Sequence, residues 1–405
     1  MKNLQILIFT FLSISLCLQS CDKNDDSCDC APNEVCIDGI CTDVSLGDDV
    51  VLVTTNISSD IEWTKDNIYR LGGRITVLPG AQLTIQAGTI IKGEAGTGPN
   101  ATALVVARGA TIEAIGTAIE PIIFTSVADE LTQTDIASGS FASPNLEPTQ
   151  NGLWGGVIVL GNAPISASGS EINIEGIPTS DPSGLYGGNS SIESSGILRY
   201  ISIRHGGANI GAGNEINGLT LGGVGSGTVI ENIEVIANQD DGIEFFGGSV
   251  NVKNAVVWNV NDDAIDTDQS WSGTLDNFVV LTPLGHCFEL DGPEGSMIVG
   301  HTIKNGLVYA SNADRTSEDL INTDDNSVVD LENIFITGIA AGQQINRVDH
   351  VEGIVNFLEV NLDVPATDLG DYVNGSAPNG IISGTKSTTD VNVFDWTWAK
   401  QDAVF

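Results

Sequence analysis

The sequence predicts an all-β protein that winds into a repeating coil. Of the 405 residues, 47 are Gly and 41% are apolar, whereas aromatic residues make up 6% and Met occurs twice. This balance favours short strands and turns over long amphipathic helices. Apolar residues alternate in stretches such as AQLTIQAGTII, which is the period of a strand with one buried face. Because similar phrases also recur after residue 230, we expect a solenoid of stacked short units.

Residues 1–20 have the composition of an export signal, with one Lys followed by a short apolar run. Their end, Leu18-Gln19-Ser20 before Cys21, resembles the bacterial lipobox, which implies that Cys21 is acylated and becomes the mature N-terminus. An ordinary secretory signal is the alternative. The next residues, CDKNDD, resemble the signal that sends Bacteroidetes lipoproteins to the outer face of the outer membrane. We therefore expect a lipid-anchored protein that faces the cell exterior.

Residues 21–45 form a short Cys-rich spacer. An even number of closely spaced Cys in an exported segment predicts two disulfides, and zinc binding is the alternative. Three disulfide pairings are possible among the four Cys of this spacer, which are Cys28, Cys30, Cys36 and Cys41. The spacer resembles the tail of an EGF-like module. Cys287 stands alone, and we expect it to be a small buried apolar side chain.

Residues 46–405 contain the repeat. Five units begin with Asn, at spacings of 22, 23, 28 and 28 residues: Asn232, Asn254, Asn277, Asn305 and Asn333. Units this short predict a right-handed, single-stranded parallel β-helix of roughly a dozen coils. Each Asn is expected at a tight bend with left-handed backbone angles, in a ladder of side-chain amides. Two polar loop insertions, 128–151 and 166–195, interrupt the coil.

Aligning the units places acidic side chains in columns beside one apolar column. The apolar column is expected to face inward: Ile243, Ile265, Phe288 and Ile321. Its neighbours on both sides are then expected to face outward. These flanking columns are Glu244, Asp266, Glu289 and Asn322; Asp241, Asp263, His286 and Asp319; Asp240, Asp262, Gly285 and Glu318; and Asp268, Asp291 and Asp324. The stretch NDDAIDTDQSW is one slice of this face, with Ile265 as its only clear core residue.

Carboxylates about 5 Å apart repel by about 3 kcal/mol per pair at an effective dielectric constant of 20. A covered acidic face therefore needs a bound cation or raised pKa values. Carboxylates without thiolates favour a hard cation, chiefly Ca²⁺. The candidate ligands are Asp240, Asp241, Glu244, Asp262, Asp263, Asp266, Asp268, Glu289 and Asp291. The alternative is a solvated acidic face that binds no ion.

A catalytic interpretation comes from a resemblance. On three successive units the phrases NQDDG, NDDA and GHC resemble the motifs of polygalacturonase-type glycoside hydrolases. The resemblance implies catalytic roles for Asp241, Asp262, Asp263 and His286, and inversion by carboxyl groups roughly 6.5–9.5 Å apart. In this chain Cys287 stands where that family has Gly, and the family's Arg-x-Lys motif is missing.

The chain has 15 basic and 53 acidic residues, a formal net charge of −38. This charge repels nucleic acid, so we exclude nucleic-acid binding. Most of residues 70–270, including LWGGVIVLGNA, LRYISIRHGG and NEINGLTLGGVGSGT, resembles a family of Bacteroidetes surface lipoproteins, which implies an exported β-helix.

These observations favour a surface-exposed outer-membrane lipoprotein whose acidic face binds a glycan or surface polymer, with Ca²⁺ as its candidate cofactor. An outer-membrane transporter complex is a further candidate partner. We expect a binding protein rather than an enzyme. A glycosidase or lyase on the same face, and a structural or adhesive surface protein, are the alternatives.

Overall fold

The computed structural model describes residues 34–37, 40–43, 50–210, 216–346, 348 and 353–405, in two compact units, Met1–Asp48 and Asp49–Phe405. In the first unit, β1 (Glu34–Ile37) and β2 (Ile40–Asp43) form an antiparallel hairpin in which Cys36 lies opposite Cys41. The export signal, the acylation site Cys21, and Cys28 and Cys30 lie outside the described residues. The lipid anchor and the disulfides therefore remain predictions.

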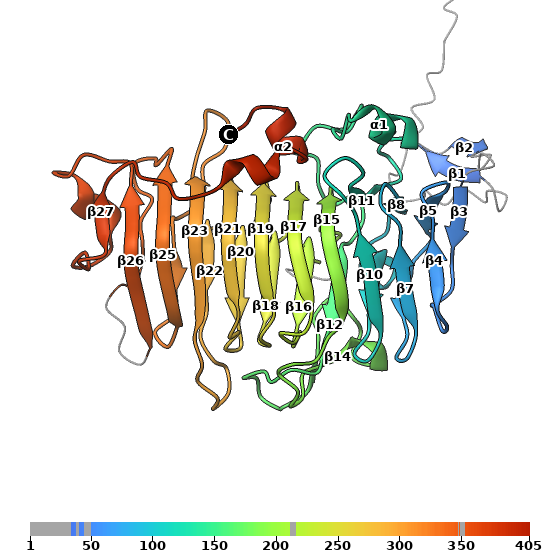
Figure 1. Cartoon of the computed structure of the whole chain (residues 1–405), viewed down its shortest axis with the longest axis horizontal. Helices are drawn as coiled ribbons and strands as arrows, with labels where there is room; N and C mark the ends of the chain where they lie inside the picture. Colours follow the sequence, from blue (N-terminus) through green and yellow to red (C-terminus); the bar gives the residue numbers. More distant parts are fainter. Residues whose placement is uncertain (1–33, 38–39, 44–49, 211–215, 347, 349–352) are drawn as a thin grey trace, which may run out of the picture. The chain divides into compact units, whose positions relative to one another are not determined.

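The second unit is the expected parallel β-helix (Figure 1). Its longer sheet runs in the order β3 (Val50–Val53), β5 (Ile68–Leu71), β8 (Ile90–Gly93), β11 (Ile122–Ser126), β15 (Gly196–Arg204), β17 (Val229–Ile236), β19 (Asn251–Trp258), β21 (Thr274–Leu281), β23 (His301–Tyr309), β25 (Val328–Thr337), β26 (Ile354–Leu362) and β27 (Ile381–Ser383). Beside it, β4 (Ile61–Trp63), β7 (Gln82–Ile85) and β10 (Thr111–Ile115) pair in sequence, and β10 joins β15.

The shorter sheet contains the remaining strand of each coil. Its order is β6 (Arg74–Val77), β9 (Ala103–Val106), β12 (Val157–Leu160), β16 (Leu219–Gly222), β18 (Ile243–Phe246), β20 (Ile265–Asp268), β22 (Phe288–Leu290) and β24 (Asn322–Thr323). All pairs in both sheets are parallel and in register, as between Ile243 and Ile265. Equivalent residues of successive coils therefore lie about 4.8 Å apart.

The predicted Asn bends are confirmed. From Asn232 to Asn333, all five residues that begin a unit have positive φ, between 54° and 63°. Each bend lies inside a long strand and changes its direction, so that β17 and its equivalents contribute two sides of the coil. Asn254 Nδ2 donates to Asn232 Oδ1 at 2.9 Å, and Asn277 Nδ2 donates to Asn254 Oδ1 at 2.8 Å. The ladder satisfies the hydrogen-bonding groups of the Asn side chains at a bend where the positive φ favours Asn.

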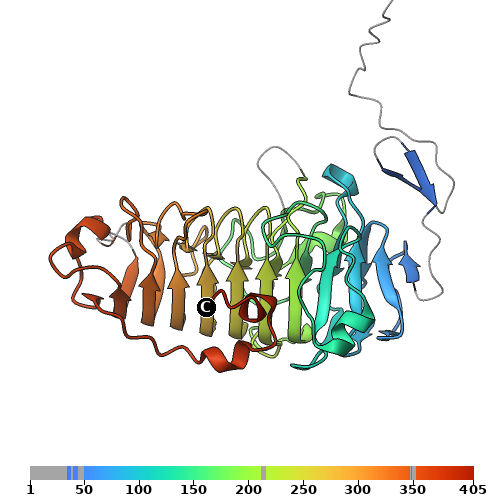
Figure 2. The same cartoon turned by 90° about the horizontal axis from the view of Figure 1, so that it is seen from above.

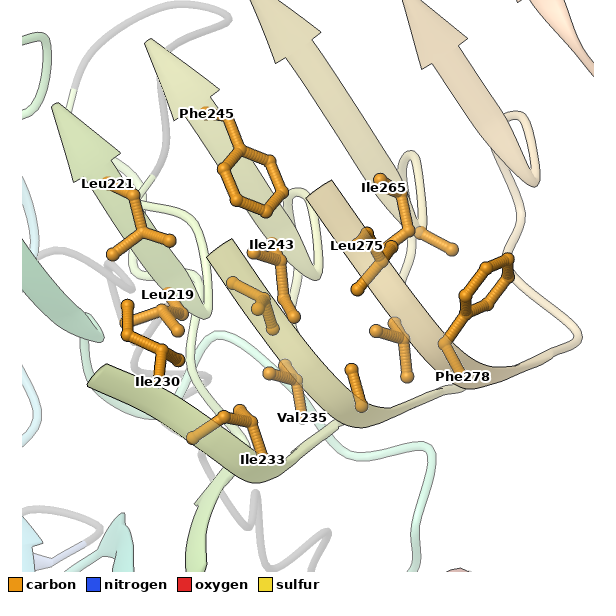
Figure 3. Close-up of a cluster of buried hydrophobic side chains, with 14 of the residues drawn as sticks. Leu219, Leu221, Ile230, Ile233, Val235, Ile243, Phe245, Ile265, Leu275 and Phe278 are labelled. Carbon is orange, nitrogen blue, oxygen red and sulfur yellow. The ribbon is translucent and has the colours of Figure 1, made fainter. Parts of the chain in front are cut away.

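The interior is filled by inward side chains from all sides of the coil (Figure 3). In Figure 3, Phe245 and Ile265 of the shorter sheet face Ile233, Leu275 and their neighbours of the longer sheet. Cys287 is fully buried in this core, and burial raises the pKa of its thiol to about 12. This agrees with the expected role as a small apolar side chain.

Two long excursions leave the coil. The first, residues 127–156, contains α1 (Gln133–Ser138); the second, residues 161–195, contains the small antiparallel pair β13 (Ile172–Asn173) and β14 (Leu185–Tyr186). Short 3₁₀ segments occur at Gly98–Asn100, Pro182–Gly184, Leu369–Tyr372 and Val391–Phe394, and α2 (Trp398–Gln401) lies near the C-terminus. In the described part of the chain, no helix is long and apolar enough to cross a membrane.

Candidate functional site

The candidate site lies on the outer side of the shorter sheet, where three neighbouring coils bring acidic residues together. We use the name acidic face for Asp240, Asp241, Glu244, Asp262, Asp263, Asp266, His286 and Glu289. Glu244, Asp266 and Glu289 lie on β18, β20 and β22, and the other members lie in the turns just before these strands. The strands fix the spacing of the face, and the turns supply most of its charge.

The predicted columns are confirmed by the register. Glu244 pairs with Asp266, Asp266 with Glu289, and Glu289 with Asn322. In the preceding turns, Gly242 N donates to Asp263 O at 2.9 Å, and Ala264 N donates to His286 O at 3.0 Å. These bonds hold the turn residues in the same register as the strands.

Two details of the sequence prediction are wrong. Ala264 comes just before the inward column, where an outward residue was expected, yet it is fully buried in the core, as is the equivalent Cys287, which was expected to be buried. They lie in the turn before the strand, where the alternation of an extended chain does not apply. Ile265 is also not the only core residue of its stretch. Thr267 is buried, and Trp271 stacks on Phe245 with ring centroids 3.9 Å apart.

The acidic face is only partly solvated, unlike the solvated face that the sequence left open as an alternative. Asp263 is 3% exposed, and Asp241 and Glu244 are each 7% exposed. Asp240, Asp266 and Glu289 are intermediate, whereas Asp262 is exposed. Carboxylates removed from water and stacked on one another need a compensating partner.

The electrostatics reflect this crowding. Burial raises the pKa of Asp241 well above its usual range, and the charges of Asp266 and Asp240 raise it further. Burial also raises the pKa of Glu244, with added repulsion from Asp241 and from Glu175 of the second excursion. Burial and the charges of Glu244 and Glu289 raise the pKa of Asp266. These three groups resist ionisation unless positive charge is supplied nearby.

One part of the face has an internal counter-charge. His286 Nδ1 lies 3.0 Å from Asp263 Oδ1. Burial disfavours the charged imidazole, but the contact with Asp263 raises the pKa of His286 to about 9. Burial likewise disfavours ionised Asp263, yet the contact with His286 lowers the pKa of that carboxyl. Burial and the adjacent Asp263 raise the pKa of Glu289 to about 8.

Among the described residues, three groups on the face each have donor atoms within 4.8 Å of one another. They are Asp240, Asp241 and Asp262; Asp241, Glu244 and Asp266; and Asp263, His286 and Glu289. The first two groups share Asp241 and consist of carboxylates alone. Such donors suit a hard divalent cation, whereas the third group already contains an imidazole that is paired with a carboxylate.

Asn217 extends the Asp241 column by one coil, because Gly218 N donates to Asp241 O at 2.9 Å. Its amide nitrogen donates to Glu244 Oε2, and the side chain is 2% exposed. Among the described residues, its amide oxygen has no hydrogen-bond partner. A buried carbonyl oxygen without a donor is costly, but it is a suitable cation ligand. Asn217 was not among the ligands predicted from the sequence, although NEINGLTLGG aligns with the later units and places it in this column.

The two remaining candidate ligands lie apart from these groups. Asp268 and Asp291 are at the far end of β20 and just after β22. Burial and the neighbouring Glu294 raise the pKa of Asp268 to about 8. Within the described residues, neither aspartate joins a group of three closely spaced donors. The structure therefore brings together seven of the nine candidate cation ligands.

The column that contains Glu289 changes from acids to amides in the later coils. Asn322 Nδ2 lies 3.3 Å from His286 Nε2. The next coil places Asn346 beside it, through the bridge between Ile321 and Ile345, and Asn374 Nδ2 donates to Asn346 Oδ1 at 3.4 Å. The predicted column ended at Asn322, because the unit spacing becomes irregular beyond Asn333.

Comparison with known proteins agrees with this architecture. A family model described as a pectate-lyase-like beta helix domain matches residues 55–399. The chain belongs to this family. No curated protein and no solved structure matches the chain. The pectate-lyase-like domain spans the coil from just after β3, including the acidic face and both excursions.

Proposed function

We propose that this protein binds a hydroxyl-rich glycan through Ca²⁺ held on the acidic face. The observation that carries the proposal is the pair of carboxylate groups that share Asp241 on adjacent coils, with donor atoms within 4.8 Å. Asp240, Asp241 and Asp262 would hold one ion. Asp241, Glu244 and Asp266 would hold a second ion or an alternative position of the first. Ca²⁺ accepts six to eight oxygen ligands, so it retains positions for ligand hydroxyls.

The surroundings favour a neutral glycan over a polyuronate. In the columns of the acidic face, the described residues include no Lys or Arg that could pair with a uronate. The amides of Asn322, Asn346 and Asn374 continue along the coil axis, and amides can both donate to and accept from sugar hydroxyls. A repeating polymer lying along the axis would meet equivalent groups about every 4.8 Å.

Residues 1–45 support the cellular part of the proposal. The export signal, the lipobox-like sequence ending at Cys21 and the following acidic residues favour an acylated protein on the outer face of the outer membrane. A lipid-anchored binding protein could present captured glycan to a transporter complex in the same membrane.

A glycosidase or lyase is the second candidate, favoured by Asp263, His286 and Glu289. A carboxyl with a lowered pKa beside one with a raised pKa is a typical arrangement for acid–base catalysis. Against an inverting mechanism, the donor atoms of this group lie within 4.8 Å, closer than the roughly 6.5–9.5 Å that accommodates a water.

Calorimetry with Ca²⁺ tests the proposal. Wild type should bind Ca²⁺, and at 100 times Kd the ion should stabilise the fold by about 2.7 kcal/mol. Asp241→Asn should abolish most of this gain, because Asp241 serves both groups. Glu113→Gln, on β10 away from the face, removes the same charge and should bind Ca²⁺ like wild type. An unfolding midpoint that does not respond to Ca²⁺ would overturn the cation site.

Glycan arrays probed with and without EGTA test the ligand. We expect Ca²⁺-dependent binding to neutral glycans in wild type and Glu113→Gln but not in Asp241→Asn. Selective binding to polyuronates would contradict the assigned ligand class. Release of reducing ends from a bound glycan, lost in Asp263→Asn, would establish the enzymatic alternative instead.

A further inference from the structure

The outer side of the longer sheet has an unusual apolar stripe. Beyond each Asn bend, alternate residues face outward, and on several neighbouring coils these residues are large and apolar: Ile236, Val256, Trp258, Val279, Leu281 and Leu307. All six are buried. Such a stripe on the outside of a solenoid would attract other molecules unless it were covered.

The C-terminal segment covers the stripe. After β27 the chain turns back and crosses the strands of the longer sheet toward the first excursion (Figures 1 and 2). Phe394, Trp398 and Ala399 are buried against the stripe, with Val391, Val393 and Phe405 packed around them. The segment therefore runs along the coil axis in the direction opposite to that in which successive coils advance.

The first contacts of the segment are with the Asn ladder. Thr388 Oγ1 donates to Asn305 Oδ1 at 3.1 Å. Two residues later, Asp390 N donates to Asn277 Oδ1 at 2.7 Å. The amide oxygens at these bends thus bind the returning chain on successive coils.

The second contacts complete a buried ion pair. Arg204 and Glu234 are at most 1% exposed, and Arg204 Nη2 lies 3.5 Å from Glu234 Oε2. Ala399 N donates to Glu234 Oε1 at 3.1 Å, and the Arg204 guanidinium lies 5.1 Å from the Trp398 ring centroid. Trp398 also meets Trp258 edge-on, with centroids 5.8 Å apart. Buried charges such as these are strongly destabilising when they are left without compensating partners.

The last contacts reach the first excursion. Phe141 N donates to Gln401 Oε1, and Gln401 Nε2 donates to Gly139 O, both at 3.0 Å. Trp396 packs with Ile136 and Phe141 of the same excursion. These bonds join residues about 260 positions apart in the chain.

We propose that residues 386–405 form a clasp that couples the early and late coils into one cooperative unit. A solenoid normally couples each repeat only to its neighbours, so its ends can unfold separately. The clasp begins near the C-terminal end of the coil and bonds to β23, β21 and β17 in turn, and then to the first excursion. It also supplies a backbone donor to Glu234 and covers the Arg204 guanidinium, so this buried pair is fully enclosed only when the last residues of the chain are present.

Hydrogen exchange on the full chain tests the clasp. In wild type, β15, β17, β23 and β25 should exchange only through global unfolding, with one urea transition. In Trp398→Ala, β15, β17 and the first excursion should exchange at least 10-fold faster than β23 and β25, and unfolding should split into two transitions. Trp271→Ala, a comparable truncation inside the coil, should lower stability and keep a single transition.

A milder variant keeps the test decisive if Trp398→Ala does not fold. Gln401→Ala removes only the two bonds to the first excursion and should speed exchange there while leaving β23 and β25 unchanged. A single transition with uniformly faster exchange in Trp398→Ala, or wild-type exchange of the excursion in Gln401→Ala, would overturn the clasp. Neither variant touches the acidic face, so Ca²⁺ binding should be retained and reports separately on the proposed function.

Discussion

At the scale of single residues, the Asn ladder combines two roles. Asn254 has φ of 59°, its Nδ2 donates to Asn232, and its Oδ1 accepts from Asn277. Left-handed backbone angles cost most residues about 1–2 kcal/mol, and each lost hydrogen bond costs about 1 kcal/mol. Asn254→Val should therefore destabilise the protein by about 2–4 kcal/mol in urea unfolding.

Asn254→Gly separates the two roles. Gly tolerates the positive φ, so only the hydrogen bonds are lost, and we expect about 1–2 kcal/mol. If Val and Gly cost the same, backbone angles do not explain why Asn recurs at the bends. If Gly costs nothing, the amide ladder contributes nothing to stability.

A buried histidine makes stability depend on pH. His301 is 5% exposed, its ring lies 4.9 Å from that of Trp271, and its Nε2 has no hydrogen-bond partner in the part of the chain that the structure describes. Burial lowers the pKa of His301 to about 3, against 6.5 in the unfolded chain. The folded state therefore stays neutral while the unfolded state takes up a proton. Stability from this residue is complete above pH 6.5 and falls as the pH drops from 6.5 toward 3.

His301→Leu isolates this effect. We measure the free energy of unfolding of both proteins in urea at pH 7, 6 and 5. Below pH 6.5, the difference between them should shift in favour of the variant by up to about 1.4 kcal/mol per pH unit. The other buried histidine with a lowered pKa, His205, is common to both proteins and cancels. A gap that does not change with pH would mean that His301 gains a proton in the folded state as easily as in the unfolded state.

At the scale of elements, the regular coils could be predicted from the sequence. The exact strand boundaries and the contacts between segments far apart in the chain could not. Asn232 and its successors mark bends that depend only on local backbone preference, so their spacing gave the register of β17 to β25 directly. The inward position of Ala264 depends on where the turn ends and the strand begins, and residue alternation does not determine that boundary. Trp271 was missed for the same reason, because it follows β20 outside the alternating pattern.

The acidic face shows the same division. The columns of Asp241 and Glu244 follow from unit alignment, but their burial depends on stacking and on the second excursion, which brings Glu175 near Glu244. Asn217 belongs to the column but lies in a unit that does not begin with Asn. The role of Trp398 was beyond prediction, because it contacts Arg204 and Trp258 only after the chain has reversed along the sheet.

At the scale of the whole molecule, charge is distributed unevenly. One outward column of the longer sheet alternates in sign across six coils: Arg199, Glu231, Lys253, Asp276, Lys304 and Glu332. Arg199 Nη2 and Glu231 Oε2 are 3.1 Å apart. This face is locally neutral, so much of the net charge of −38 is left on other surfaces, including the acidic face.

Screening of this net charge should stabilise the fold. Raising NaCl from 10 to 100 mM shortens the Debye length from about 30 to about 10 Å, which weakens repulsion between distant carboxylates more than attraction within close ion pairs. In EGTA, which keeps Ca²⁺ out of the measurement, the unfolding midpoint in calorimetry should rise by at least about 2 °C. Sucrose at equal osmolality controls for solute effects other than screening. A midpoint that falls with salt would mean that the alternating column and other ion pairs outweigh the repulsion, and that the excess acids are spread widely enough to be tolerated without a cation.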